Sequence, residues 1–595
     1  MGSGIQPSSI PTKVIILGAG FHGLAAAKTY LQINPQIELR IIDNGSSIGG
    51  VWATDRIYPG LFYEVPTPMG DFSDFDMCTE LGMEMFQDIS GEQVNQFLVK
   101  YAEKFDLLKY CRLNTTATSI TRSNPGWKLT VKPTGDPGAE PEVLTCDKLI
   151  VATGINSRPK VPDLELSSYD GLHMHSVALG KRHEELLADD IKSVTIIGGH
   201  KSALEAVGHC AAAGKTVNWL VRKDGGGTTW LIMARNPDGS SSAKASTKRV
   251  LGIFTPSVYY SSRWITRFFF SDRFWLGSWI MNSFWNKFTS MLLSDHYTKS
   301  ENAKKLKPNV SSFFWFVPVG TSLHDRDLET LRLINEEKLI HVKRNHIESA
   351  QGRSVTLDSG EVLASDAIIY CTGWQTNTTD LFTPELAHEL GLPIDPIEEP
   401  VSSQKHWQAI DKAAEDTLLD LYPILRRPPG AVKNMRPKLT PHRQYRSIVP
   451  LESALQNDRS LIFLGRTITG RVPINAELTS LWGVAYLENM LPASTNYALQ
   501  SRAVMEKDIA TVQAFQKLRY VGYYPFRISI METPEFMDQL CKDVGVSSQR
   551  KAKKVPKGWR GAWGLRGWCL EWFGSYFASD YRGIVDEFLQ IAKKS

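Results

Sequence analysis

Two segments of this chain share one order of residue types: an apolar run, a cluster of glycines and a helix-forming run. They are Val14–Ala27, VIILGAGFHGLAAA, and Val194–Ala206, VTIIGGHKSALEA. An apolar, β-branched run that leads into glycine predicts a buried parallel strand, and an alanine-rich run predicts a helix. The chain is therefore predicted to have an α/β fold with two Rossmann-like dinucleotide-binding domains.

The first glycine cluster has the spacing of a dinucleotide-binding loop, with the residues Gly18, Ala19, Gly20, Phe21, His22 and Gly23. Gly18 allows the tight turn, Gly20 the close approach of a pyrophosphate, and Gly23 the close packing of helix on strand. The next strand ends at Asp43, twenty residues after Gly23, where a carboxylate can accept the ribose hydroxyls of FAD or NAD. The alternative is a glycine-rich turn in an α/β fold that binds no nucleotide.

The second cluster repeats this order with two differences, and its residues are Gly198, Gly199, His200, Lys201, Ser202 and Ala203. His200 stands where the middle glycine is expected, so Gly199 is expected to share that role by shifting the turn. Arg222 and Lys223 replace the acid at the end of the next strand. A guanidinium can bind a 2′-phosphate through two hydrogen bonds, which favours NADPH. The alternative is that both cations are solvated surface charges.

A second repeated pattern, D-x-x-I-x-x-T-G, occurs at Asp147–Gly154 and Asp366–Gly373. Such strands mark where a chain passes between the nucleotide domains of a two-dinucleotide flavoprotein. They predict these regions: 1–165, the first part of the FAD-binding domain; 166–365, the NADPH-binding domain, with an aromatic-rich insertion at about 225–330; 366–500, the second part of the FAD-binding domain; and 501–595, a C-terminal extension.

Composition restricts the remaining classes of function. The chain has 595 residues, with Lys+Arg 67, Asp+Glu 63 and a net charge of +4, which argues against a nucleic-acid partner. Its seven cysteines are scattered, so neither a metal site nor a CxxC redox pair is expected. An odd, scattered set of cysteines indicates a reducing compartment. The first residues lack an apolar signal region, and the longest uncharged aromatic run is too short to span a bilayer. A cytoplasmic protein is predicted.

Five further motifs follow in order: Gly49-Gly50-Val51-Trp52, Tyr58-Pro59-Gly60, the FSDF of 72–75, the RPKVP of 158–162 and the YDGLHMHS of 169–176. Together with the two glycine loops, these residues resemble the class B flavin-dependent monooxygenases. That superfamily comprises flavin-containing and Baeyer–Villiger monooxygenases, and the chain looks most like members from fungal natural-product pathways. The resemblance covers about residues 12–225 and 360–485.

The resemblance implies a site as well as a fold. It implies catalytic roles for Glu64, His175 and Ser176, and cofactor contacts, besides the two loops, from Asp43, Asn44, Gly50, Val51, Trp52, Tyr58, Thr153, Gly154, Arg222, Lys223, Thr372 and Gly373. His175 and Ser176 are expected to position the nicotinamide. Taken singly, Trp52, Tyr58, Phe75 and His175 are better explained as core residues.

The reaction implied is transfer of one oxygen atom from O2 to a lipophilic small molecule in secondary metabolism. NADPH reduces the flavin, and a peroxide at its C4a carbon carries the oxygen; a dry pocket protects it. Two departures bear on the reaction type. Leu179 replaces the aromatic residue of the Baeyer–Villiger fingerprint, and Glu64 stands where that group has aspartate and flavin-containing monooxygenases have asparagine.

Several alternatives therefore stay open. Ketone oxidation of the Baeyer–Villiger type is one, and an NADPH-dependent flavin reductase or oxidase is another. A non-catalytic flavoprotein is a third. Amine or sulfide oxygenation, hydroxylation and epoxidation stay open as reactions, and residues 225–330 and 385–450 are expected to line the substrate pocket.

Two segments rich in Trp, Phe, Arg and Lys, Phe254–Phe288 and Lys551–Phe577, lie outside these motifs. Tryptophan beside cations is typical of a membrane interface or a lipophilic channel, which predicts peripheral contact with a membrane. The alternative is that these aromatics cover the core between domains. In the second segment Trp559, Trp563, Trp568 and Trp572 have nearly helical spacing, but interspersed glycines disfavour a helix.

Overall fold

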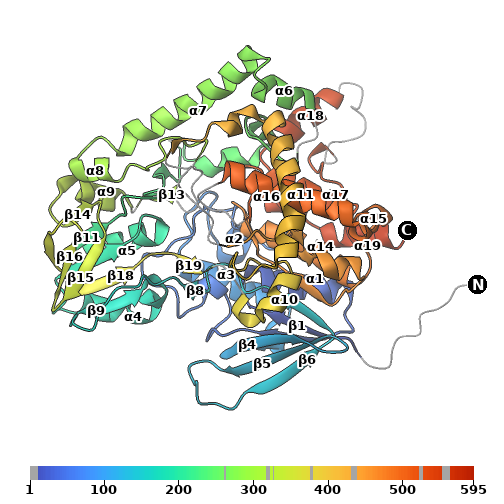
Figure 1. Cartoon of the computed structure of the whole chain (residues 1–595), viewed down its shortest axis with the longest axis horizontal. Coiled ribbons are helices and arrows are strands. Elements are labelled where there is room, and N and C mark those ends of the chain that lie inside the picture. The colour runs from blue at the N-terminus through green and yellow to red at the C-terminus, as the bar shows by residue number, and fades with distance from the viewer. Residues whose placement is uncertain are drawn as a thin grey trace, which may run out of the picture.

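The structure is a computed structural model, which describes residues 11–236, 238–259, 263–315, 322–325, 327–375, 379–430, 439–520, 527–552 and 563–594. Two parallel sheets organise it (Figure 1). The first has the order β22–β7–β1–β2–β3, with bounds Leu461–Phe463, Lys148–Val151, Lys13–Leu17, Glu38–Ile42 and Cys111–Arg112. The strand order reverses between β1 and β7, which places a crevice beside Gly18 at their carboxyl ends.

The second sheet is arranged in the same way around its glycine-loop strand, but one of its outer strands precedes that strand in the chain instead of following it. Its order is β14–β11–β10–β18–β9, with bounds Ile340–Lys343, Thr216–Leu220, Ser193–Ile197, Ala367–Tyr370 and Leu172–His175. All its strand pairs are parallel, and the order reverses between β10 and β18, next to the second glycine loop. The predicted α/β fold with two Rossmann-type halves is confirmed.

The chain leaves the second half later than the sequence predicted. The expected boundary was residue 366, but β18 (Ala367–Tyr370) lies inside the second sheet, between β10 and β9. Its register pairs Val194 with Ala367. The return to the first half therefore begins only after Gly373.

Each half carries an antiparallel three-stranded sheet, β4–β5–β6 in the first and β15–β16–β17 in the second. The bounds are Thr115–Arg122, Trp127–Pro133 and Glu142–Cys146, then Ile347–Gln351, Ser354–Leu357 and Val362–Ala364. The two chain segments that cross between the halves pair with each other as β8 (Arg158–Pro159) and β19 (Trp374–Gln375). Three further two-residue pairings join β12 Ile232–Met233 with β13 Ser322–Leu323, β20 Gln444–Tyr445 with β21 Val449–Pro450, and β23 Thr467–Ile468 with β24 Arg527–Ile528.

Helices cover both sheets and join them. In the first half α1 (Phe21–Ile33) packs along α14 (Val472–Leu487), which is buried from Pro473 to its end. One continuous core includes residues of both sheets and of the C-terminal extension. The other helices are α2 Met77–Leu81, α3 Gly91–Lys104, α4 Leu179–Leu187, α5 Lys201–Ala212, α8 Glu301–Lys305, α9 Asp327–Glu336, α10 Pro384–Glu389, α11 Val401–Leu421, α13 Leu451–Leu455, α15 Ala493–Gln500, α16 Arg502–Arg519, α17 Thr533–Asp543 and α19 Ile584–Ala592.

The aromatic insertion forms a helical hairpin, α6 (Arg263–Phe270) and α7 (Trp275–His296), at the top of Figure 1. Met281 and Trp285 point into the core, while Trp264, Trp275 and Trp279 are 72%, 75% and 61% exposed. The inner side of the hairpin thus covers the core, as the alternative expected, while the outer side is exposed. Among the helices of the described ranges, none combines the length and the apolar content needed to cross a membrane.

The C-terminal aromatic segment contains the helix α18 (Trp563–Phe573), close to α6 in Figure 1. The helix continues through Gly564 and Gly567, although glycines disfavour it. Trp568 and Trp572, one turn apart, contact each other with tilted rings whose centroids lie 6.0 Å apart, which supports this turn. Trp559 lies outside the described residues.

Candidate functional site

The first glycine loop is packed too tightly for side chains. Gly18 has a φ of +115°, and a Cβ built on it would lie 2.4 Å from the Ala152 carbonyl oxygen at the end of β7. A Cβ on Gly23 would lie 1.8 Å from the Gly18 carbonyl oxygen. The loop therefore presses α1 against its own strand, and the helix N-terminus opens into the crevice.

Asp43 fixes this loop from the end of β2. Its carboxylate accepts hydrogen bonds from the amide groups of Ala19 (2.6 Å) and Gly45 (2.7 Å). Burial raises the pKa of Asp43 in spite of these bonds. Its remaining acceptor sites are available to a ribose, while the neighbouring Asn44 is exposed at the rim.

The Gly49–Trp52 segment lies on top of the loop. The Gly49 amide donates to the Ala19 carbonyl at 3.0 Å, and Trp52 is buried with its ring edge-on to Tyr63. Gly50 has its Cα within 3.6 Å of the Cβ position of Gly20, whereas Val51 is exposed. Of this motif, the backbone of Gly50 thus lines the crevice, and Trp52 supports it from behind.

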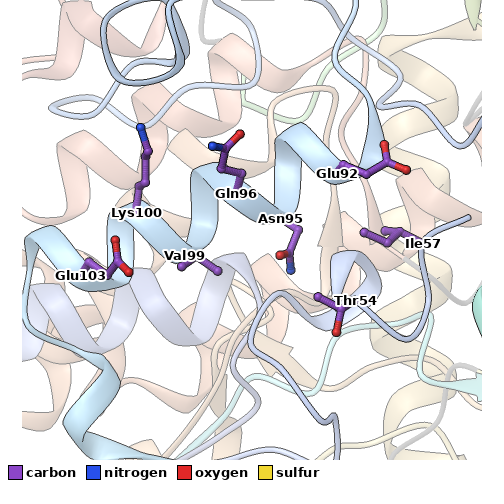
Figure 2. Close-up of a pocket in the computed structure, with 8 residues that line it drawn as sticks. All are labelled: Thr54, Ile57, Glu92, Asn95, Gln96, Val99, Lys100 and Glu103. Atoms are coloured by element: carbon purple, nitrogen blue, oxygen red, sulfur yellow. The ribbon is translucent and has the colours of Figure 1, made fainter. Parts of the chain in front are cut away.

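Sequence reasoning missed Asn95, a positioning residue on α3. Its side-chain amide donates to the carbonyls of Ile48 (3.1 Å) and Trp52 (2.7 Å), which fixes both ends of the Gly49–Trp52 segment. The sequence could have indicated it through an asparagine on the apolar side of an amphipathic helix, where a polar side chain needs a hydrogen-bond partner. In Figure 2, Asn95 projects from α3 toward the segment that carries Thr54 and Ile57.

Figure 2 shows the outer side of this region, an open groove of about 520 Å³. None of the residues predicted to bind a cofactor lines it; its walls are Thr54, Ile57, Glu92, Asn95, Gln96, Val99, Lys100 and Glu103. The groove is thus separate from the crevice at the strand ends.

The FSDF motif ties three elements together. Glu477 of α14 accepts hydrogen bonds from the amide (2.8 Å) and hydroxyl (3.0 Å) of Ser73, and Lys28 of α1 forms an ion pair with Asp74 at 2.5 Å. Burial raises the pKa of Glu477 to about 7. The motif therefore clamps α1 to α14 and is structural.

The residues of the first crevice fit FAD. Along its length lie buried polar atoms that have no hydrogen-bond partner in the protein: the hydroxyl oxygens of Thr153 and Thr469 and the Asn475 amide oxygen. Thr153 and Gly154 follow β7, and the amide of Asn475 lies 3.5 Å from Nε2 of His22 in the glycine loop. Acceptor and donor groups at these places match the ribityl and ring atoms of a flavin.

The second loop differs from the first at its third position. A Cβ built on Gly198 would lie 2.3 Å from the Cys371 carbonyl oxygen, as close as the contact at Gly18, but Ala203 is buried at the position that Gly23 holds in the first loop. The Gly199 carbonyl accepts from the Thr229 amide at 2.8 Å. His200 precedes α5 with an ordinary φ of −112°. Burial, and then the charge of Arg222, lower the pKa of His200 to about 4, so its ring is neutral. A neutral ring leaves the helix N-terminus accessible to phosphate charge.

The two predicted phosphate ligands differ. Arg222 is 61% exposed and 4.0 Å from its nearest acid, Asp224, whereas Lys223 forms an ion pair with Asp358 at 2.9 Å. Arg222 can therefore turn toward a 2′-phosphate at little cost, while Lys223 must first leave its partner.

Lys201 and Glu64 join the two halves. Lys201, the first residue of α5, forms ion pairs with Glu64 (2.9 Å) and Glu205 (2.5 Å), and donates to the Phe62 carbonyl at 2.8 Å. The second carboxylate oxygen of Glu64 accepts from the Ser322 amide at 3.0 Å. The Lys201 side chain, assigned to the cofactor from sequence, thus holds the end of the second crevice against the first half. Ser202 follows in the same turn, its carbonyl accepting from the Cys371 thiol.

His175 and Ser176 lie where the chain crosses between the halves. The His175 Nε2 group donates to the Gly373 carbonyl at 3.0 Å, and Nδ1 accepts from the Val177 amide at 3.2 Å. Burial lowers the pKa of His175, in agreement with this neutral tautomer. The Thr372 hydroxyl donates to the Lys160 carbonyl of the other crossing segment. These residues therefore meet around the paired crossing strands.

Two aromatic contacts complete this junction. Tyr58 is buried against His209 of α5, with ring centroids 5.6 Å apart. Arg56, which sequence reasoning missed, stacks on Trp374 at 5.1 Å and donates to the Asn156 carbonyl at 2.8 Å. The 56–64 segment of the first half is thus held by α5 and by both crossing segments.

Comparison with known proteins identifies the family. A family model described as pyridine nucleotide-disulphide oxidoreductase matches residues 15–230. The FAD-dependent monooxygenase DEP4 of Alternaria brassicicola is 30% identical, over 98% of this chain and 95% of its own. An FAD-dependent monooxygenase of Pyrenophora dematioidea is 32% identical, over 91% of this chain and 99% of its own. The chain belongs to the FAD-dependent monooxygenases.

Solved structures support the fold of this FAD-dependent monooxygenase. OTEMO in complex with FAD and NADP matches with a TM-score of 0.58 and 16% identity, covering 90% of this chain and 98% of its own. The open form of cyclohexanone monooxygenase matches with a TM-score of 0.55 and 15% identity, over the same shares. The predicted resemblance, the oxidoreductase class and the cofactor FAD are confirmed at the level of the family, while NADPH stays a prediction.

Proposed function

We propose that this monooxygenase receives electrons from NADPH at the second glycine loop, passes them to FAD at the first, and inserts one oxygen atom of O2 into a lipophilic small molecule. The contact of Lys201 with Glu64 and Phe62 carries this proposal, because it brings the two crevices to one junction. When bound, FAD supplies the electron transfer between NADPH and O2 that amino-acid side chains do not provide.

The residues of the chain bind the two cofactors, orient them and shield the junction between them from water. The first glycine loop and the end of α1 bind the FAD pyrophosphate, and Asp43 accepts a ribose hydroxyl. Arg222 binds the 2′-phosphate of NADPH through its exposed guanidinium. Glu64 neutralises Lys201 and holds the Ser322 backbone over the junction, which limits the entry of water there.

His175 and Ser176 are proposed as positioning residues. Both ring nitrogens of His175 are engaged by backbone groups of the crossing segments. The side chain therefore acts on the nicotinamide indirectly, by fixing the angle at which β9 and Gly373 meet.

A test begins with the purified yellow holoprotein and NADPH without oxygen. We expect NADPH to bleach the flavin, and 18O2 to add a single labelled atom to one of a panel of lipophilic amines, sulfides, ketones and alkenes. Consumption of NADPH without labelled product would identify a reductase or oxidase instead. Colourless protein that ignores NADPH would indicate a non-catalytic role.

Peripheral contact with a membrane is the second part of the proposal. The exposed side of the α6–α7 hairpin carries Trp264, Trp275 and Trp279, and Trp568 and Phe573 of α18 are 50% and 51% exposed. Both α6 and α18 pack on the same short helix, 249–254, so these side chains gather at one end of the molecule (Figure 1). Tryptophan at an exposed helical turn inserts favourably into the headgroup region of a bilayer.

Charges on the hairpin suit an anionic membrane. Arg267, Arg273 and Lys287 are exposed there, as is the acid Asp272. We expect sedimentation with phosphatidylcholine–phosphatidylserine vesicles that weakens with salt and falls about tenfold in Trp275→Ala/Trp279→Ala. Ile397→Ala, which removes an equally exposed apolar side chain elsewhere, should bind normally. Equal binding by both variants, or none by the wild type, would contradict the assignment.

A further inference from the structure

The segment that leads into α14 lies beside the first glycine loop. A Cβ on Gly465 would lie 3.2 Å from Nδ1 of His22, and Asn475 in the first turn of α14 lies 3.5 Å from Nε2 of the same ring. The first hydrogen bond of the helix runs from the Asn475 amide to the Arg471 carbonyl. The amide groups of Val472 and Ile474 therefore have no acceptor within the helix, and the positive end of its dipole lies next to the flavin crevice.

Arg471, the residue that precedes α14, is buried without a partner. It is 3% exposed, and none of its three guanidinium nitrogens has a hydrogen-bond partner in the protein. Burial of a charge without hydrogen bonds is strongly unfavourable, so a buried guanidinium of this kind indicates a binding partner.

The neighbouring groups do not neutralise this charge. The nearby carboxylate of Asp580 is already engaged by Lys551 at 3.0 Å and by the Phe577 amide at 2.9 Å. Arg249, a second neighbour, repels Arg471 and is itself paired with Asp538 at 2.6 Å. The positive charge at the start of α14 is therefore available to a ligand.

We propose that Arg471 and the N-terminus of α14 form an oxyanion-binding site beside the flavin-binding loop, and that the ligand is the carboxylate or enolate of an acidic, lipophilic substrate. A guanidinium offers two parallel N–H groups to two oxygens, and the helix end adds amide donors and a positive field. The site deepens the proposed function, on which it rests, by naming the polar group of the molecule that is oxygenated.

The same chemistry could be supplied by the carbonyl oxygens of the flavin ring, and two measurements on the holoprotein separate the sources. The first is titration with octanoate and with octan-1-ol, followed by the visible absorption of the bound flavin and by equilibrium dialysis. The second is the midpoint potential of the bound flavin. Neither needs turnover, so a failure of the oxygenase assignment would not affect them.

We expect octanoate to bind the wild type at least tenfold more tightly than octan-1-ol. Arg471→Met should weaken octanoate tenfold or more and leave octan-1-ol unchanged, with Arg471→Lys in between because it keeps the charge and loses the fork. Arg519→Met is the matched control, since Arg519 is also fully buried with unpartnered nitrogens but stacks on Phe314 and Tyr520. It should bind octanoate normally.

Three outcomes would overturn the proposal. One is equal binding of octanoate and octan-1-ol by the wild type, which needs no variant to fold. Another is an unchanged octanoate affinity in Arg471→Lys and Arg471→Met proteins that retain FAD. The third is a lower midpoint potential of the bound flavin in Arg471→Met than in the wild type, with octanoate binding unchanged. That result would assign Arg471 to the flavin ring.

Discussion

The two glycine loops follow the central strands of their sheets, but they differ in the packing between helix and strand and in the contacts of the residue that ends the next strand. In the first loop Gly23 admits no side chain, since its Cβ would meet the Gly18 carbonyl at 1.8 Å, whereas Ala203 carries a buried methyl group at the corresponding place. The difference is confined to this place: Gly198 of the second loop is packed as closely as Gly18, with a built Cβ 2.3 Å from a carbonyl oxygen, but the second loop accommodates a methyl group between helix and strand.

The residues at the two strand ends differ in the same way. Asp43 is engaged by two backbone amides at 2.6 and 2.7 Å, while Arg222 is largely exposed and 4.0 Å from its nearest acid. A preformed site suits a cofactor that stays bound, because little ordering remains to be done on binding. An adaptable site suits NADPH, which must enter and leave in each catalytic cycle.

Reciprocal substitutions at the third glycine position should give the largest difference. Gly23→Ala forces a methyl group into a backbone carbonyl, which we expect to cost about 3 kcal/mol of stability and to yield protein without FAD. Ala203→Gly should cost about 1 kcal/mol through helix propensity and leave FAD bound. Thermal unfolding and the flavin absorbance of the purified proteins measure both effects. Similar losses in the two variants would remove the distinction between the loops.

Coenzyme preference should show an intermediate effect. Arg222→Ala removes the hydrogen bonds of this exposed guanidinium to a charged phosphate, together worth about 1.5 kcal/mol, so the KM for NADPH should rise about tenfold. The KM for NADH should hardly change. Lys223→Ala is the matched control, because that ammonium is paired with Asp358, and it should raise the NADPH value less. Equal changes for both coenzymes in Arg222→Ala would exclude Arg222 from the 2′-phosphate site.

Local patterns predicted the halves well because each Rossmann unit is specified by contiguous residues. The β1–loop–α1 order and the distance from Gly23 to Asp43 lie within one stretch of chain, and both appear in the structure. The return boundary at 366 was misplaced because a strand motif does not reveal which sheet the strand will join.

The junction between the halves could not be predicted in the same way. Lys201 and Glu64 are far apart in sequence, and their pairing at 2.9 Å depends on how α5 packs against the 56–64 segment. Nor could the pattern show that Asn95 turns inward to hold two loop carbonyls, or that Trp275 and Trp285 of one helix face opposite environments. Such features depend on tertiary packing.

The smallest expected effect concerns the pH dependence of stability that the histidines of the two loops contribute. Burial lowers the pKa of both His22 and His200 to about 4, but only for His200 does the charge of Arg222 contribute. The unfolded chain therefore takes up protons more readily than the native state. The stability of each neutral ring is present above pH 6.5 and is lost as the pH falls from 6.5 toward 4.

The contributions of His22 and His200 to the fall in Tm at acidic pH can be separated by measuring each histidine variant with and without Arg222→Ala. Arg222→Ala removes a repulsive charge from His200, so the fall in Tm between pH 7 and pH 5 should become shallower by less than about one degree, the size expected for a few tenths of a kcal/mol in a chain of this length. His200→Asn should abolish this difference between the backgrounds, since asparagine does not titrate. His22→Asn should flatten the slope equally with and without Arg222, because no cation of the second loop acts on it. If Arg222→Ala leaves the slope unchanged, the second loop does not hold its histidine and its arginine in electrostatic contact, and the two loops are more alike in solution than their geometry indicates.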